Sequence, residues 1–170
     1  MSLCAEAAYF TALCRPHPGE HWLDVGTSAG FYAGVLARAG AQVTACDISP
    51  AMLREAARRE PHPNIYYALL NAERSGLPGE SFSGVTIGAT TGETASPQAM
   101  LAEAARLLIP GGQLWIMAQA RDGSGAQALL TRFGGLSFAD EAQLTAWLPG
   151  LRRTDFWRRG NIVFGRWIKS

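Results

Sequence analysis

The sequence predicts an α/β fold: a doubly wound, mostly parallel, seven-stranded sheet with helices on both faces and a C-terminal antiparallel hairpin. Short apolar runs alternate with amphipathic stretches of about ten residues, which is typical of βαβ units. Two Ser-Pro pairs, Ser49-Pro50 and Ser96-Pro97, each place a capping residue and a proline where a helix should begin. The last residues differ, because two strand-like runs flank the short turn Arg158-Arg159-Gly160.

The first half of the chain contains two strand–helix repeats after an opening helix. The opening helix ends before Pro16, since a proline disfavours helix at the preceding residue, and the next helix ends at Gly40. An apolar run closed by small residues indicates a buried strand and a tight turn. The expected elements are a helix over residues 5–14, a strand over 21–25, a turn over 26–30, a helix over 31–39, a strand over 42–47 and a helix from 50 to about 60.

The second half continues the alternation and then departs from it. Pro110-Gly111-Gly112 separates a helix from the strand that follows. The expected elements are strands over residues 64–70 and 84–88, a helix over 98–108, a strand over 113–117, helical material between 126 and 148, and two hairpin strands over 154–157 and 161–168.

The composition is that of a folded protein. Of 170 residues, 48% are hydrophobic and 17% charged, which excludes intrinsic disorder. No run approaches the roughly 20 apolar residues of a membrane span, and the first residues lack the pattern of a signal peptide. We therefore expect a single domain, residues 1–170, in a cytoplasmic protein.

Metal and disulfide chemistry are not indicated. The cysteines are odd in number and share no Cys-x-x-Cys spacing, and the histidines are no better spaced for a metal. We expect reduced, buried cysteines and no metal site. The residues concerned are Cys4, Cys14, Cys46, His17, His21 and His62.

Two aspartates mark the expected ligand site. In a doubly wound sheet, ligands bind outside the carboxyl ends of the strands. Asp24 lies near the end of the first strand, before the small-residue turn 26–30, whose backbone can approach a ligand closely. Asp47 ends the second strand, 23 residues after Asp24. An acid at about this distance is a usual partner of ribose hydroxyls.

Four motifs in order resemble those of class I S-adenosylmethionine-dependent methyltransferases, nearest the small-molecule and quinone-type branch. They are Leu23-Asp24-Val25-Gly26-Thr27-Ser28-Ala29-Gly30, Val43-Thr44-Ala45-Cys46-Asp47-Ile48-Ser49, Asn71-Ala72-Glu73 and Leu108-Ile109-Pro110-Gly111-Gly112-Gln113-Leu114. The resemblance covers roughly residues 20–117 and implies a Rossmann-like methyltransferase fold with S-adenosylmethionine as cofactor.

The resemblance also implies a role for each matching position. The methionine end of the cofactor would be held by Asp24 and the backbone of Gly26, Thr27, Ser28 and Gly30. Asp47 would bind the ribose, Ile48 and Met52 would line the adenine face, Asn71 and Ala72 would meet its edge, and Gly88 and Ala89 would flank the sulfonium.

Three departures from the family pattern leave an alternative open. Ser28 replaces the middle glycine of the turn, Asn71 stands where an aspartate is common, and Phe82-Ser83 replaces a Phe-Asp pair. The alternative is a degenerate methyltransferase fold that acts as a non-catalytic binding or scaffold module. A nicotinamide-dependent oxidoreductase is disfavoured, because Gly-x-Gly-x-x-Gly is absent.

The sequence does not identify a catalytic residue or the methyl acceptor, which we expect to be a small molecule. Glu93 is the only titratable side chain in residues 89–96, where we interpret it as a solvated loop carboxylate. His17 and His21 precede the first strand and are interpreted as surface residues. Since no long insertion forms a cap, either the acceptor site is open or a second copy of the chain closes it as a homodimer.

A basic C-terminal segment does not indicate a nucleic-acid partner. Residues 151–170 contain six cationic side chains and one aspartate, yet the whole chain has a formal net charge of +1. Such a cluster provides few phosphate contacts. We expect Trp157 and Trp167 to pack into the protein while the arginines solvate an exposed strand at the sheet edge.

Overall fold

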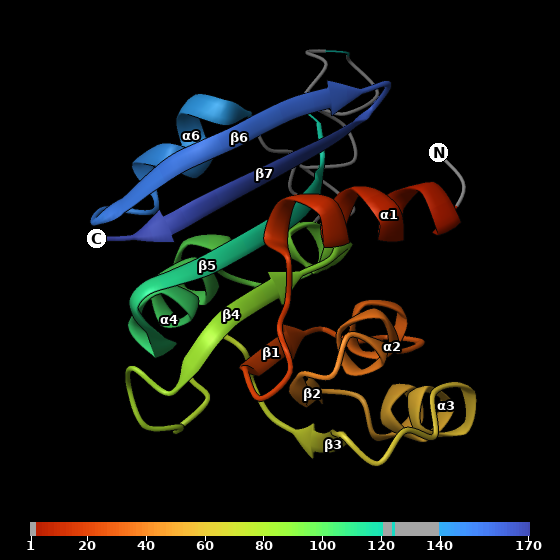
Figure 1. The fold of residues 1–170 in the computed structure, drawn as a ribbon. Helices are drawn as coiled ribbons and strands as arrows, with labels where there is room; N and C mark the ends of the chain where they lie inside the picture. Colours follow the sequence, from red (N-terminus) through yellow and green to blue (C-terminus); the bar gives the residue numbers. More distant parts are fainter. Residues whose placement is uncertain (1–2, 121–123, 125–139) are drawn as a thin grey trace.

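The computed structural model describes residues 3–120, 124 and 140–170, and it contains the expected seven-stranded sheet (Figure 1). The strand order is β3-β2-β1-β4-β5-β7-β6. β1 to β5 run parallel to one another, whereas β7 runs antiparallel to both β5 and β6. The predicted fold class, including the C-terminal hairpin, is confirmed.

The elements follow the predicted order, and β1 and β2 have the predicted bounds. β5 and β6 are longer than predicted, and only α6 of the helical material expected between residues 126 and 148 lies within the described residues. The bounds are α1 Leu3–Cys14, β1 His21–Val25, α2 Phe31–Arg38, β2 Gln42–Asp47, α3 Pro50–Arg59, β3 Ile65–Leu69, β4 Phe82–Ile87, the 3-10 helix η1 Ala89–Gly92, α4 Pro97–Leu107, β5 Leu108–Gln119, α6 Glu141–Ala146, β6 Leu151–Arg159 and β7 Ile162–Lys169.

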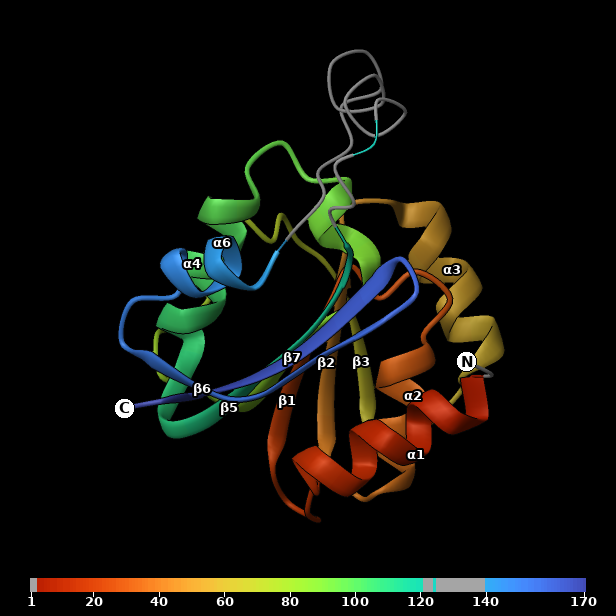
Figure 2. The ribbon, with the colours of Figure 1, turned by 90° about the horizontal axis from the view of Figure 1, so that it is seen from above.

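The helices form a layer on each face of the sheet. Seen from above, α1, α2 and α3 cover one face, and α4 and α6 cover the other (Figure 2). Successive strand residues point to opposite faces, so Trp22 joins the aromatic core under α1 and α2 while Leu23 joins the aliphatic core under α4. The fold therefore has two hydrophobic cores separated by one sheet.

Both predicted Ser-Pro helix starts are confirmed. Ser49 Oγ accepts a hydrogen bond from the amide of Met52 at 3.3 Å, and Ser96 Oγ accepts one from Ala99 at 3.2 Å. Each cap satisfies one of the backbone N–H groups that the first turn of a helix leaves unpaired. The cap of α3 also fixes where the chain turns after Asp47, at the carboxyl end of β2.

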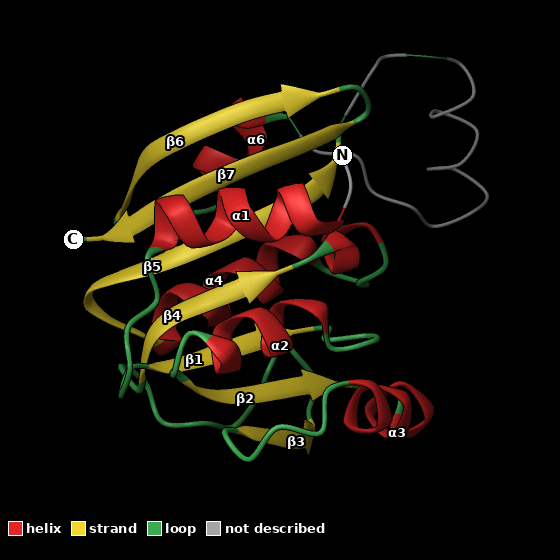
Figure 3. Cartoon of the chain, turned by 45° about the vertical axis from the view of Figure 1, so that its right-hand side comes forward, coloured by secondary structure: helices red, strands yellow, loops and turns green. Residues whose placement is uncertain are grey.

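The hairpin forms one edge of the sheet, beside β5 (Figure 3). Trp167 is fully buried, and Trp157 is half-buried and stacks on Phe164 with ring centroids 5.3 Å apart. Both tryptophans thus pack into the protein as expected. The exposed cations of the edge strand β6 are Arg152, Arg153, Arg158 and Arg159.

Cys14 and Cys46 are buried free thiols, as expected. Burial raises the pKa of each thiol to about 12, so neither forms a reactive thiolate near neutral pH.

Across the described ranges, no helix has the length and apolar character needed to cross a membrane.

Gly84 in β4 has no space for a side chain. The ring of Trp22 packs against its Cα so closely that a Cβ at this position would overlap the indole. We expect Gly84→Ala to lower the free energy of unfolding by about 1–3 kcal/mol, the usual cost of overpacking a core. Urea denaturation measures the effect. Gly79→Ala is the matched control, because a Cβ there mainly meets the flexible end of Arg106; an equal loss in both variants would contradict the prediction.

Candidate functional site

Asp24 lies near the carboxyl end of β1, and its carboxylate is directed into the protein. The residue is 2% exposed. Thr27 Oγ1 donates to Asp24 Oδ2 at 2.7 Å, and Thr86 Oγ1, from β4, donates to Oδ1 at 2.7 Å. Burial raises the pKa of Asp24 to about 6, against the opposing effect of these two hydrogen bonds. The carboxylate therefore connects the turn after β1 to the neighbouring strand β4.

Asp47 ends β2 and is half-buried beside the same turn. The Ser28 amide donates to Asp47 Oδ2 at 3.1 Å, and the Ser49 amide donates to Oδ1 at 2.9 Å. Ser28 has a φ of 49°, in the left-handed region that few non-glycine residues adopt. Each carboxylate oxygen has lone pairs for a second donor, so Asp47 keeps the capacity to accept from a ligand hydroxyl.

An exposed apolar surface surrounds Asp47. Ile48 is 73% exposed, Met52 38% and Leu69 60%, and Leu69 is the β3 residue in register with Asp47. Within residues 3–120 and 140–170, three of the five exposed large hydrophobic side chains thus gather at one place. An apolar surface beside a carboxylate acceptor fits a flat heterocycle joined to a sugar.

Gly26 begins the turn after β1, and the segment after β4 packs directly on it. Gly26 has a φ of 62°, and a Cβ at this position would overlap the side chain of Thr90 in η1. Thr90 Oγ1 also donates to the Gly26 carbonyl at 3.3 Å. The glycine is therefore required both by its backbone conformation and by the close approach of Thr90.

Gly88 follows β4 and lies beside the ring of Tyr32. A Cβ built there would meet only Tyr32 Cε2, at 3.8 Å, among the atoms of the described residues. Ala89, predicted alongside Gly88, begins η1. Among the described residues, a side chain at position 88 would thus contact the Tyr32 ring at the carboxyl edge of the sheet.

Three other predicted residues make contacts away from Asp24 and Asp47. Gly30, in the left-handed conformation at the N-cap of α2, packs against Ala56 and Glu60 of the α3 segment. Asn71 Oδ1 accepts a hydrogen bond from the Glu73 amide at 2.8 Å, within its own loop. Ala72 is half-buried against the aliphatic core.

The loop after β3 contains a structural carboxylate to which the sequence assigned no role. Glu73 Oε1 accepts from Thr94 Oγ1 at 2.5 Å and from the Ser96 amide at 2.9 Å. These bonds, the Thr94 hydroxyl first, lower the pKa of Glu73. Glu73 thereby joins the loop after β3 to the start of α4.

A second buried polar group lies under α1 and was not predicted. Tyr32 Oη donates to Glu6 Oε1 at 2.6 Å and accepts from Trp115 Nε1 at 3.0 Å. Glu6 lies in α1, Tyr32 in the first turn of α2 and Trp115 in β5. The available sequence signal was a tyrosine two residues after the glycine turn, which helical periodicity alone assigns to the core.

The remaining titratable candidates do not extend the site. Glu93 is exposed, in agreement with its interpretation as a loop carboxylate. His17 and His21 are also exposed, and His21 Nε2 lies 3.1 Å from Thr44 Oγ1 at the amino end of β1. Both histidines therefore lie at the end of the sheet opposite Asp24 and Asp47.

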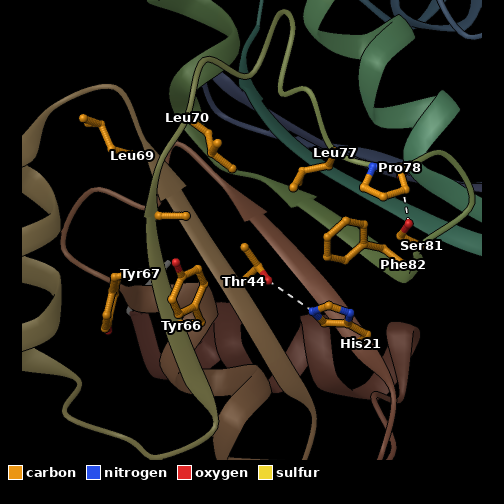
Figure 4. Close-up of a pocket in the computed structure, with 11 residues that line it drawn as sticks. His21, Thr44, Tyr66, Tyr67, Leu69, Leu70, Leu77, Pro78, Ser81 and Phe82 are labelled. Carbon is orange, nitrogen blue, oxygen red and sulfur yellow. Dashed lines mark hydrogen bonds between the residues drawn. The ribbon is translucent and has the colours of Figure 1, made fainter.

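A hollow of about 520 Å³ lies along β3 and near the amino ends of β1 and β4, and it shares only Leu69 with the apolar surface at Asp47 (Figure 4). Residues 70–81, which follow β3, form no helix that would cover the sheet there. Because ligands of such sheets bind at the carboxyl ends, this hollow is not the candidate cofactor site, and none of the predicted site residues lines it. The lining residues are His21, Thr44, Tyr66, Tyr67, Ala68, Leu69, Leu70, Leu77, Pro78, Ser81 and Phe82.

The sheet order and the glycine turn define a Rossmann-like α/β protein, and the two edge carboxylates mark a candidate ligand site at its carboxyl edge. The chain belongs to the family of class I S-adenosylmethionine-dependent methyltransferases. The family model described as a methyltransferase domain matches residues 23–116, more than half of the chain. The family resemblance noted in the sequence is thus confirmed, and the cofactor of the family is S-adenosylmethionine.

Curated relatives share moderate identity with this chain. The demethylmenaquinone methyltransferase of Tropheryma whipplei strain Twist is 36% identical over 118 residues, which cover 67% of this chain and 49% of the relative. The ubiquinone biosynthesis O-methyltransferase of Xanthomonas campestris pv. campestris strain B100 is 35% identical over 103 residues, covering 58% and 43%. The chain thus spans about half the length of the curated relatives it matches.

Solved structures show the same fold. The magnesium protoporphyrin IX methyltransferase of Synechocystis, with bound SAH, has a TM-score of 0.78 at 20% identity, covering 99% of this chain and 81% of that one. A SAM-dependent methyltransferase from Aquifex aeolicus has a TM-score of 0.75 at 22% identity, covering 96% and 88%. At these identities the likeness concerns the fold alone.

Proposed function

We propose that this chain transfers a methyl group from S-adenosylmethionine to a small-molecule acceptor. The observation that carries the proposal is the exposed apolar surface of Ile48, Met52 and Leu69 around the half-buried Asp47, in a chain of the methyltransferase family. A ligand with an adenine and a ribose matches this surface in both its apolar and its hydrogen-bonding parts.

Different residues of the chain would bind different parts of the cofactor. The Asp47 carboxylate would accept from the ribose hydroxyls, and Ile48 and Met52 would pack on the adenine face. Asn71 and Ala72 would meet the adenine edge, whereas Gly88 and Ala89 would border the reacting methyl group. The bound cofactor supplies an electrophilic methyl group for in-line displacement, so positioning provides most of the rate.

The turn after β1 would hold the methionine end of the cofactor. The residues concerned are Gly26, Thr27, Ser28 and Gly30, and their backbone would face the ligand. Asp24 supports this part of the site from within, because its buried carboxylate accepts from Thr27 in the turn and from Thr86 in β4. A rigid turn keeps its backbone groups in place before the ligand arrives.

The names of the curated relatives suggest the first acceptors to test. One is named for demethylmenaquinone, and another for an O-methylation in ubiquinone biosynthesis. We therefore infer that a quinone-related ring is the first class of small molecule to screen. For the assembly, a homodimer that closes the acceptor site remains part of the proposal.

Calorimetry with S-adenosylhomocysteine tests the proposal and gives its first mutational prediction. The wild-type chain should bind this product, and Asp47→Ala should weaken binding by about 1–3 kcal/mol, the cost of leaving buried polar partners unmatched. Asp47→Asn keeps one acceptor oxygen and should fall between the two. Because Asp47 also accepts from Ser28 and Ser49, thermal unfolding must show that each variant is folded.

Glu80→Ala is the matched control for this titration. Glu80 is an exposed carboxylate in the loop before β4, at the amino end of the sheet. Its removal should leave the affinity for S-adenosylhomocysteine unchanged. A folded wild-type chain that shows no binding at millimolar ligand would contradict the proposal.

One contact supports a second candidate function, a non-catalytic binding or scaffold module. Thr90 covers Gly26, so the segment after β4 closes part of the turn. The same titration separates the candidates. A folded chain without affinity for S-adenosylhomocysteine supports the module, and methylation of any acceptor contradicts it.

A further inference from the structure

The buried pair Glu6–Tyr32 has no part in the function proposed so far. Glu6 is 9% exposed and Tyr32 is 5% exposed. The 2.6 Å hydrogen bond between them joins α1 to α2 beside the aromatic core. Burial of a carboxylate is costly unless it is hydrogen-bonded. A hydrophobic side chain at position 6 would pack α1 against α2 without the cost of burying a carboxylate.

The pair lies beside the candidate site. The Tyr32 ring lies beside Gly88, where a Cβ would be 3.8 Å from Cε2. The N-terminal end of α1, which carries Glu6, lies on the side toward which β4 and β5 point (Figures 1 and 3). Asp24, Thr86 and Trp115 also occupy one register row across β1, β4 and β5, so the two polar groups are neighbours on this face.

We propose that Glu6 is the general base of the methyl transfer and receives, through Tyr32, the proton of a hydroxyl acceptor. This inference rests on the proposed function and specifies its acceptor as a hydroxyl compound, with a phenol as the model case. As the acceptor oxygen forms its bond to the methyl group, its O–H bond breaks and the proton passes to Tyr32 Oη. The Tyr32 proton passes to Glu6 Oε1, and the carboxylic acid then loses it to solvent.

The surroundings suit Tyr32 as a relay and Glu6 as the final acceptor. Burial raises the pKa of Tyr32, as does its hydrogen bond to Glu6, so the phenol stays protonated at neutral pH. Trp115 Nε1 donates to Tyr32 Oη and occupies one lone pair, which leaves the other for the acceptor hydroxyl. The rings of Phe10 and Phe31 lie 5.2 and 5.1 Å from that of Tyr32, so aromatic side chains surround the ring of the relay.

Two catechols of different acidity test the base. Catechol is almost fully protonated at slightly alkaline pH, whereas 4-nitrocatechol has already lost a proton. Glu6→Gln and Tyr32→Phe should each lower kcat on catechol by about 10²–10⁴-fold, the usual contribution of general base catalysis. Both variants should keep kcat on 4-nitrocatechol within about tenfold, because that acceptor needs no base.

A binding measurement tests the contact between the acceptor hydroxyl and Tyr32 Oη in the absence of catalysis. With S-adenosylhomocysteine present, calorimetry compares catechol with 1,2-dimethoxybenzene, its dimethyl ether. The wild-type chain should prefer catechol, because only catechol donates to Tyr32 Oη. Tyr32→Phe should remove this preference.

The matched control is Tyr67→Phe, and it separates a base from a structural tie between helices. Tyr67 Oη donates to the carbonyls of Ala56 and Glu60 at 3.1 and 3.0 Å, so this variant also loses partly buried hydrogen bonds on the same face. It should slow neither catechol reaction. Equal losses on both catechols in the Glu6 and Tyr32 variants, with S-adenosylhomocysteine affinity retained, would overturn the inference.

The remaining outcomes are also decisive. A wild-type chain that binds S-adenosylhomocysteine but methylates neither catechol would overturn the hydroxyl acceptor class while leaving the proposed function intact. A wild-type chain that does not bind S-adenosylhomocysteine would instead contradict the proposed function itself, and the inference with it.

Discussion

Trp115→Ala is expected to lower the free energy of unfolding by about 3–5 kcal/mol, the usual cost of truncating a fully buried tryptophan to alanine. Trp115 is 0% exposed at the centre of the aromatic core. Its ring lies 5.3 Å from Phe10, 5.4 Å from Trp157 and 6.2 Å from Phe164. The variant would leave a cavity among three elements and remove the N–H donor to Tyr32 Oη.

Trp115→Phe separates the two contributions, and urea denaturation of both variants measures them. Phenylalanine keeps an aromatic ring but lacks the N–H group, so it should cost about 1–3 kcal/mol, between wild type and Trp115→Ala. Trp157→Ala is the control from the same cluster. Because Trp157 is only half-buried, it should cost less than Trp115→Ala; an equal or larger loss would contradict the assignment of Trp115 as the centre of this core.

The elements around the first glycine turn were predictable because their signals are local. Residues 21–25 and 42–47 are apolar runs closed by small or capping residues, and both strands have the predicted bounds. The Ser49-Pro50 and Ser96-Pro97 pairs carry cap and first helical residue in one dipeptide, so α3 begins where expected and α4 begins one residue earlier than predicted. These strand bounds and helix starts could be predicted from local sequence alone, without knowledge of tertiary packing.

Two strands were underestimated because turn-forming and charged residues lie within them. β5 begins at Leu108 and includes Pro110. A proline is tolerated there because β5 pairs with β7 only from Gln113 onward, and a register shift against β4 lies at the same place. β6 includes arginines at both ends, which resembles a loop in sequence but is typical of an edge strand.

The residues that contact one another across the site could be predicted only in part. The position of Asp24 and Asp47 at the carboxyl edge follows from the order of strands. The partners of Asp24 include Thr86, 62 residues away, and Glu6 meets Tyr32 26 residues away. These pairs depend on strand register and on how α1 packs, neither of which leaves a pattern in the local sequence.

The Asp24→Asn variant is expected to change how stability depends on pH. The pKa of Asp24 is raised from 3.8 to about 6 in the folded chain, chiefly by burial. Between these values the folded state binds more protons than the unfolded state, so wild-type stability should fall as pH rises. A difference of about two pH units corresponds to about 3 kcal/mol. The destabilising contribution is absent below about pH 3 and complete above about pH 7.

An asparagine at position 24 has no charge to bury, so the variant should lack this fall in stability. The unfolding free energy of Asp24→Asn relative to wild type should therefore rise by about 3 kcal/mol between about pH 3 and pH 7. Urea denaturation at a series of pH values measures this difference. Thr86→Val is the matched variant, because it keeps Asp24 but removes one hydroxyl donor, which should raise the pKa of Asp24 further and extend the fall to higher pH.

A charge that destabilises the folded chain at neutral pH is expected to have a functional reason. Asp24 accepts from Thr27 inside the turn that would hold the cofactor, so Asp24→Asn should gain stability at neutral pH and lose affinity for S-adenosylhomocysteine. Calorimetry and denaturation on the same preparation test both effects together. A variant that keeps the wild-type pH dependence would contradict the raised pKa of Asp24. A variant that gains stability without losing affinity would show that the turn does not need this carboxylate.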